Sequence, residues 1–214
     1  MGYTTDFLGH LTLTPPATKE QRDYINLISK TRRMKRDVNK LFQIYKGKYG
    51  NPFAESDEEI YGNEGEYFAK DDGQSGENHD DSIIDYNVSP GQMGYDQAKV
   101  LGFNAFFYGN KRRSENGDCQ PGLWCQWVIS EDGTRLEWDE GEKFYDYIPW
   151  LKYYINHFFK KWGIKLNGRI RFQGEDPGDK GIIEVIDNVV GLGEPKRKIT
   201  LEDPYGEEEW DDDI

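Results

Sequence analysis

The sequence lacks the features that mark membrane insertion and export. It contains no apolar run of about 18 residues, so no transmembrane helix is predicted. The N-terminal residues have neither the basic nor the apolar region of a signal peptide. Asp6 stands where an N-myristoylation signal has Ser or Thr. We therefore expect a cytoplasmic protein with no membrane partner.

Cysteine is also scarce, because the chain contains only Cys119 and Cys125. We expect two reduced thiols, with Cys125 buried in a strand and Cys119 in a loop. A disulfide or half of a zinc site is the alternative. Zinc needs further ligands, and His10, His79 and His157 show no ligand spacing.

The composition indicates a packed core in spite of a low apolar content. Hydrophobic residues make up 36% of the 214 residues, whereas aromatic residues make up 14%. Disordered chains are poor in aromatic residues, so part of this chain must fold. Five of the six tryptophans lie between Leu123 and Gly163, which places the expected core there.

Charge is distributed unevenly along the chain. Residues 1–50 carry ten Lys and Arg against four Asp and Glu, and residues 51–89 carry one against twelve. Residues 90–199 are balanced, and residues 200–214 carry eight acidic residues and no basic one, giving a net charge of −13. This layout favours a protein that meets partners through its surface field. We also expect the basic arm to fold back on the acidic insertion.

Local patterns predict strands and helices in both halves of the chain. Residues 3–14 alternate as a strand, and a capping box of Thr18 with Gln21 opens a helix expected over 19–36. Residues 46–95 are loop-like, with a short ordered piece near Ser82 to Tyr86. The C-terminal half is predicted to hold a hairpin turn at Asp132-Gly133, a helix from about 146 to 162, and strands at 123–130, 135–139, 169–173, 181–190 and 195–201.

This order predicts an α+β protein, a two-layer sandwich with a ferredoxin-like β-α-β-β-α-β core and extra C-terminal strands. We expect a single domain over 1–201 that carries an acidic, Gly-rich insertion at 46–118. The acidic tail at 202–214 is expected to be disordered.

Several sequence blocks resemble an uncharacterised family of hypothetical proteins from bacteria and their phages. The blocks are Met1–Thr5, Asp80–Asn87, Gln120–Trp127, Glu142–Tyr145 and Gly174–Asp179. The resemblance covers most of the chain and brings no activity with it. It implies the host cytoplasm as the location if a phage encodes the protein. Residues 88–118 look longer than in these relatives, so this stretch is a candidate for a function of its own.

Two acidic groups are candidate metal ligands. One holds Asp80, Asp81 and Asp85, and the other holds Asp176 and Asp179 together with Glu175. If the fold brings the groups together, their oxygens suit Mg²⁺ or Ca²⁺. The alternative is that these aspartates only start turns and cap helices. No cofactor is expected, and a divalent cation is the open alternative.

Basic and aromatic residues form a second candidate set. Arg32, Arg33 and Lys35 are candidates for phosphate contact, although cations at the end of a helix also have a purely structural role. Trp124 and Trp138 can stack on bases or pack in the core.

His157 is a candidate general base, or it packs on neighbouring aromatic rings. No Ser or Cys nucleophile has a base within local reach, and Gly191-Leu192-Gly193 lacks the third glycine of a dinucleotide motif.

The leading hypothesis is a non-catalytic interaction protein with a protein partner, in a phage an inhibitor of a host nucleic-acid-directed system through its acidic surface. The second hypothesis is a nucleotide or small-ligand binding module, which keeps nucleic acid open as a partner. The third is a metal-dependent hydrolase that uses the loop aspartates.

Overall fold

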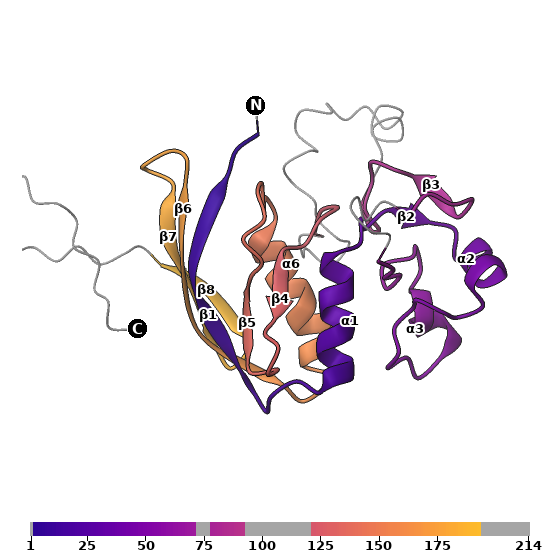
Figure 1. Ribbon diagram of the computed structural model, residues 1–214, viewed down its shortest axis with the longest axis horizontal. Helices are drawn as coiled ribbons and strands as arrows, with labels where there is room; N and C mark the ends of the chain where they lie inside the picture. The colour runs from indigo at the N-terminus through magenta and orange to yellow at the C-terminus, as the bar shows by residue number, and fades with distance from the viewer. Residues whose placement is uncertain (1, 72–77, 93–120, 194–214) are drawn as a thin grey trace, which may run out of the picture.

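A computed structural model of the chain describes residues 2–71, 78–92 and 121–193 (Figure 1). These residues form a mixed α/β structure around a six-stranded sheet with the order β4-β5-β1-β6-β7-β8, in which every recorded strand pair is antiparallel. The strands are β1 (Thr5–Thr14), β4 (Trp127–Ile129), β5 (Arg135–Trp138), β6 (Lys165–Gly174), β7 (Lys180–Ile186) and β8 (Val189–Gly193).

The alternation of side chains along β1 produces one buried and one exposed face. Leu11 and Leu13 are buried, whereas the side chains of Leu8, His10 and Thr12, which belong to the other face, are exposed. β1 pairs with β6 along its whole length, and Leu11 lies opposite Leu136 of β5. The predicted strand at 3–14 is therefore confirmed and occupies the centre of the sheet.

Two helical segments cover one face of this sheet. α1 (Lys19–Ser29) and α6 (Tyr147–Tyr154), which continues as a π-helical turn over Ile155–Phe159, lie on the same side of it in Figure 1. The apolar stripe of the second segment is buried at Leu151, Ile155 and Phe158. Gly163, with a φ of 69°, follows the segment and ends it as predicted.

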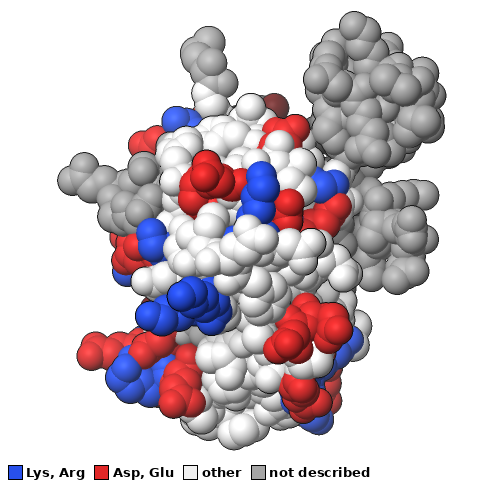
Figure 2. Space-filling view, turned by 90° about the vertical axis from the view of Figure 1, so that its right-hand side faces the viewer, with Lys and Arg blue, Asp and Glu red and all other residues white. Residues whose placement is uncertain are grey.

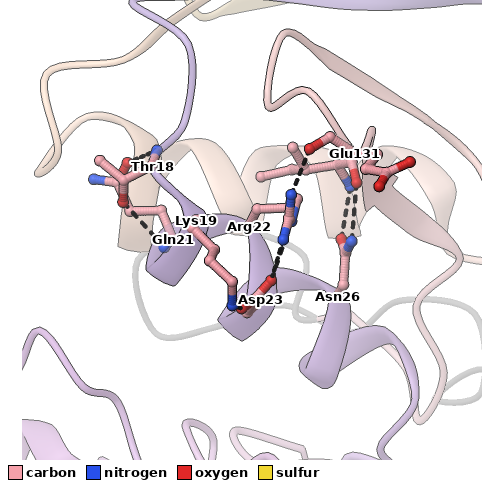
Figure 3. Close-up of polar contacts among 8 residues, drawn as sticks. Thr18, Lys19, Gln21, Arg22, Asp23, Asn26 and Glu131 are labelled. Atoms are coloured by element: carbon pink, nitrogen blue, oxygen red, sulfur yellow. Dashed lines mark hydrogen bonds and ion pairs between the residues drawn. The ribbon is translucent and has the colours of Figure 1, made fainter.

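α1 begins at the predicted capping box. The backbone N–H of Gln21 donates to the Thr18 hydroxyl over 3.3 Å, and the Thr18 N–H donates to the Gln21 side chain over 2.9 Å (Figure 3). Both groups belong to the first turn, where backbone N–H groups have no partner within the helix.

A side-chain clamp holds α1 against the β4–β5 hairpin. The Asn26 amide donates to the carbonyl of Ile129 over 2.9 Å and accepts from its N–H over 2.7 Å (Figure 3). One turn earlier, Arg22 donates to the carbonyl of Glu131. The exposed edge of β4 thus receives hydrogen bonds from α1 in place of a further strand.

The first helix is shorter than the sequence pattern predicts. The prediction of a helix over 19–36 is wrong, because α1 ends at Ser29 and Lys35–Arg36 forms β2, paired with β3 (Ile83–Asp85). The Thr31 hydroxyl accepts the N–H of Lys70 over 2.9 Å, a partner 39 residues away. This tertiary hydrogen bond is made in a segment that would otherwise continue the helix. β3 confirms the short ordered piece expected near Ser82 to Tyr86.

Two further strand predictions need correction. The strand expected at 181–190 is a hairpin of β7 and β8, because Asp187 and Asn188 adopt positive φ values of 48° and 69°. Such values at both central positions suit a two-residue turn. The Asn188 side chain stabilises the turn by donating to the Ile164 carbonyl over 2.8 Å. The strand expected over 123–130 is shorter, since β4 spans only Trp127–Ile129.

A second, smaller cluster lies on the far side of α1 from the sheet (Figure 1). It contains α2 (Val38–Tyr45) and α3 (Asp57–Tyr61), and it buries Leu41, Tyr61 and Phe68. Figure 2 looks onto the side that carries α2, α3 and β3 in Figure 1, and it shows acidic and basic side chains next to one another.

Some predictions fall outside the described residues, namely those for Cys119, the strand at 195–201 and the tail at 202–214. Cys125 is a free cysteine and is buried as expected, but it precedes β4 and does not lie in a strand. None of the described helices combines the length and apolar character that a membrane crossing requires.

Candidate functional site

The basic residues that follow α1 fold onto the acidic insertion. Lys35 pairs with Glu64 over 2.6 Å, and Lys30 lies 3.6 Å from Asp71. These ion pairs confirm the expectation that the basic arm and the acidic segment neutralise each other. Part of the positive charge that suggested phosphate contact is thus neutralised by ion pairs within the chain.

Arg36 is the most buried of these basic residues, with 1% of its surface exposed. Its guanidinium donates to the Asp80 carboxylate over 2.7 Å, to the Ser82 hydroxyl over 2.7 Å and to the Asn78 carbonyl over 2.8 Å. It also lies over the ring of Phe68, 4.5 Å from the centroid. We call these five residues the Arg36 network.

The Arg36 network determines the charge state of Asp80. Burial raises the pKa of this carboxyl, but hydrogen bonds from Ser82 and the charge of Arg36 outweigh burial and bring the pKa below its ordinary value. Asp80 is therefore an ionised structural partner of Arg36, because its oxygens accept bonds from Arg36, Ser82 and Tyr45.

Arg33 is buried as well and points into the protein. Its guanidinium donates to the carbonyls of Pro90 and Pro121, each over 3.2 Å. It lies 4.8 Å from the ring centroid of Tyr153 in α6. Arg33 thus joins three segments that are far apart in the sequence.

Arg32, the neighbour of Arg33, lies near the surface between two aromatic rings. Its guanidinium carbon is 4.1 Å from the ring centroid of Tyr86 and 5.7 Å from that of Trp124. The ring of His79 stacks on that of Tyr86, with centroids 5.1 Å apart and planes only 11° from parallel. We call His79, Tyr86, Arg32 and Trp124 the arginine stack.

Hydrogen bonds fix the orientation of the arginine stack. Arg32 donates from Nε to the Tyr86 carbonyl over 3.1 Å and from Nη2 to the Asn87 side chain over 3.3 Å. Trp124 remains 37% exposed in this arrangement. Trp124 is thus an exposed aromatic side chain next to a half-buried guanidinium that hydrogen bonds hold in position.

Two other predicted binding residues lie away from the stack. The indole N–H of Trp138 donates to Gln126 over 3.0 Å, and its ring packs on Phe7 in the core. His157 on the second helical segment shares a hydrogen bond of 2.8 Å between its Nδ1 and the Tyr67 hydroxyl. Its ring stacks on Tyr153 at 4.1 Å.

The structure does not bring the two acidic groups together. Asp80, exposed Asp81 and half-buried Asp85 lie around β3, on the opposite side of Figure 1 from the β6–β7 hairpin that carries Asp176 and Asp179. Asp179 accepts a hydrogen bond from the Tyr3 hydroxyl over 2.7 Å. Among residues 2–71, 78–92 and 121–193, no group of three or more His, Cys, Asp and Glu side chains is arranged to hold a metal ion.

Burial favours the neutral form of two titratable side chains, those of Cys125 and Tyr67. Burial raises the pKa of the Cys125 thiol to about 12, so the reactive thiolate does not form near neutral pH. Burial likewise raises the pKa of Tyr67, the hydrogen-bond partner of His157, to about 12.

Sequence reasoning selected Arg32 and Trp124 but missed Tyr86, His79 and Asn87. The residues of the Asp80–Asn87 block do not indicate that Tyr86 lies against Arg32. The spacing between positions 32, 86 and 124 carries no periodic signal that could have revealed the contact.

Comparison of the chain with protein-family models, with curated proteins and with solved structures finds no match. The function is therefore argued from the residues of the site alone.

Proposed function

We propose that this protein is a non-catalytic interaction protein that binds a partner protein through the arginine stack. The observation that carries the proposal is the position of Arg32 between Tyr86 and exposed Trp124. Trp, Tyr and Arg are the residue types that dominate binding energy at protein interfaces. Because hydrogen bonds already hold Arg32, little side-chain entropy is lost when a partner binds.

Charge favours a protein partner over nucleic acid. The net charge of −13 repels polyphosphates at long range. Lys35 is paired with Glu64, and Arg33 is buried among backbone carbonyls. A partner with basic residues around an apolar centre suits both the stack and the acidic surface of the chain. Inhibition of a host nucleic-acid-directed system stays a prediction within this function.

The scaffold that positions the site is, in this proposal, a ferredoxin-like core. The order β4-β5-β1-β6, the antiparallel pairing, and the placement of α1 and α6 on one face support that assignment. The arginine stack lies outside this core, in segments that follow α1 and precede β4.

The test compares co-purification by the full chain with that of single variants. Trp124→Ala and Arg32→Ala should each lower the yield of a specific partner about tenfold or more, the effect of losing a residue that contributes about 1.4 kcal/mol to binding. Tyr145→Ala is the matched control, because Tyr145 is 60% exposed and lies outside the stack. A partner retained equally by all three variants would contradict the proposal.

Nucleotide binding is the second candidate, and the exposed Trp124 beside a guanidinium is the observation that favours it. Thermal unfolding of the full chain with a panel of nucleotides tests it. A ligand at a hundredfold excess over its dissociation constant stabilises the native state by about 2.7 kcal/mol. A shift that Trp124→Ala abolishes would establish this function in place of the first.

A further inference from the structure

One face of the six-stranded sheet is not covered by any described element. α1 and α6 both lie on the opposite face (Figure 1). The pairing registers place the side chains of this open face in rows across the strands. One row runs from Leu8 through Arg171 to Ile182, and the next runs from His10 through Arg169 to Glu184. We call this surface the open face.

The open face combines exposed apolar groups with positive charge. Leu8 is 69% exposed, Ile186 is 60% exposed and Val189 is 71% exposed. The outward positions of β6 and β7 carry four basic residues and one acidic residue, namely Lys165, Arg169, Arg171, Lys180 and Glu184. In a chain with a net charge of −13, these outward positions are thus locally basic, although ion pairs of Arg169 with Glu184 over 2.7 Å and of Lys165 with Asp187 over 3.2 Å neutralise part of that charge.

The most acidic segment of the chain follows the edge strand of this sheet in the sequence. β8, the last strand, is the edge strand next to β7 and ends at Gly193. Residues 200–214 then contain eight acidic residues, no basic one, and the apolar residues Leu201, Tyr205, Trp210 and Ile214. Acidic and apolar groups in one segment are the complement of the basic and apolar groups on the open face.

The connection between β8 and the acidic segment is long enough for the acidic segment to reach the open face. Residues 194–199 separate Gly193 from the acidic segment, and six extended residues span about 20 Å. Three strand spacings separate β8 from β1, which is about 14 Å. Residue 200 can therefore reach any strand from β8 to β1.

We propose that the acidic C-terminal segment, residues 200–214, docks on the open face of the same chain. This inference uses a different surface from the arginine stack and does not depend on the proposed function. The composition of the segment predicts no fold of its own, and docking on a complementary surface requires none.

Charge also favours the C-terminal segment over a second copy of the chain as the occupant of the open face. Antiparallel pairing of β8 with β8 of another copy would use the same edge and the exposed Val189 and Leu192. Such a dimer would bring together two segments with eight acidic residues each, which repel one another. Docking within one chain instead places acidic residues against basic ones.

Zero-length cross-linking of the full chain tests the proposal. A carbodiimide activates a carboxylate, and a nearby lysine amine displaces the activating group, so that an amide bond forms. Trypsin then releases residues 199–214 as one peptide, because no Lys or Arg follows Lys198. At low salt, this peptide should be linked to Lys165 and Lys180 about tenfold more often than to Lys19 and Lys152, exposed lysines of the helical side.

Variants and salt check that charge on the open face is responsible. Arg171→Glu should lower the yield of the Lys180 link about fivefold, whereas the matched control Lys152→Glu should leave it unchanged. Sodium chloride at about 1 M should remove most of the link, because the Debye length falls to about 3 Å. Circular dichroism and thermal unfolding establish that the variants fold.

Two results would overturn the inference. Equal linkage to all four lysines would mean that the segment does not prefer the open face. In a mixture of isotopically heavy and ordinary chains, links between heavy and ordinary peptides would show that the occupant belongs to a second copy.

Discussion

The sheet with its two helical segments and the segment from Thr31 to Gln92 are stabilised in different ways. The sheet buries a continuous set of aliphatic and aromatic side chains, including Trp127, Trp150 and Ile170. The other segment has a small apolar cluster, and much of its packing surrounds two buried guanidinium groups, those of Arg33 and Arg36.

This difference matters because the two kinds of interaction fail differently. Removing apolar atoms from a packed core costs the lost transfer free energy and leaves a cavity. Removing one member of a buried ion pair leaves an uncompensated charge, whereas replacing both members can cost little. The sheet should therefore be sensitive to volume, and the segment from Thr31 to Gln92 should be sensitive to polar pairing.

The largest effect is expected in the sheet core. Trp127→Ala should lower the free energy of unfolding by about 4 kcal/mol, measured by urea denaturation. Its ring is fully buried, packs on Phe7 at 5.3 Å and on Phe144 at 5.1 Å, and donates to the Tyr147 carbonyl over 2.8 Å. Tyr145→Ala is the control, since a substitution at a side chain that is 60% exposed should cost about 0.5 kcal/mol. Equal losses in the two variants would remove the distinction between core and surface.

The next largest effect, that of replacing Arg36, distinguishes the segment from Thr31 to Gln92 from the sheet. Arg36→Met should cost about 3 kcal/mol, because Asp80 and Ser82 lose their buried partner. Hydrogen exchange should show residues 31–92 opening first while β1 and β6 stay protected.

A double variant supplies the control for this experiment. Arg36→Met with Asp80→Leu should recover at least half of the loss, because neither charge remains buried without its partner. Uniform loss of protection across both regions, or no recovery in the double variant, would show that the Arg36 network is not a separable polar unit.

A smaller effect is expected at the clamp between α1 and β4. Asn26→Ala should cost about 2 kcal/mol in urea denaturation, because the N–H and the carbonyl of Ile129 both lose their partner. Asn156→Ala is the matched control, since Asn156 is exposed and accepts only from Lys160. A change at Asn26 no larger than at Asn156 would mean that the clamp adds nothing to packing.

The smallest effect is a loss of stability in alkali. Burial raises the pKa of Tyr61 and of Tyr67 to about 12, above the value of about 10 in an unfolded chain. The two hydroxyls therefore stay protonated to a higher pH in the native state than in the unfolded chain. Their contribution to the free energy of unfolding is complete below about pH 10 and is lost as the pH rises to about 12. Denaturation between pH 8 and pH 11.5 should show the decline, and Tyr67→Phe should reduce its slope. A pH-independent free energy of unfolding would contradict the burial argument.

Local sequence patterns were sufficient to predict much of the sheet and of the helices that cover it. The strand at Thr5–Thr14, the capping box at Thr18 and the presence of a β4–β5 hairpin follow from alternation, capping chemistry and turn preference, which act over a few residues. The turn itself differs from the predicted two-residue turn at Asp132-Gly133, because the Gly133 N–H donates to the Ser130 carbonyl. The apolar stripe predicted a helix over about 146–162, and the structure has α6 and its π-helical turn there.

Predictions failed where a distant partner decides the local structure. The end of α1 depends on Thr31 bonding to Lys70 and on the N–H of Arg33 donating to the Leu123 carbonyl over 2.7 Å. The buried position of Arg36 depends on Asp80, which is 44 residues away. A single sequence shows the residue types in such pairs but not the pairing.

The sequence by itself determined the balance of charge, the mixed α/β class and the residue types at the candidate site. Only the tertiary structure decided that Arg32 meets Tyr86 and Trp124, that Trp138 and His157 lie elsewhere, and that the two acidic groups stay apart. The physical reason is that periodicity, caps and turns are local, whereas ring stacking and ion pairs between segments form only after the chain has folded.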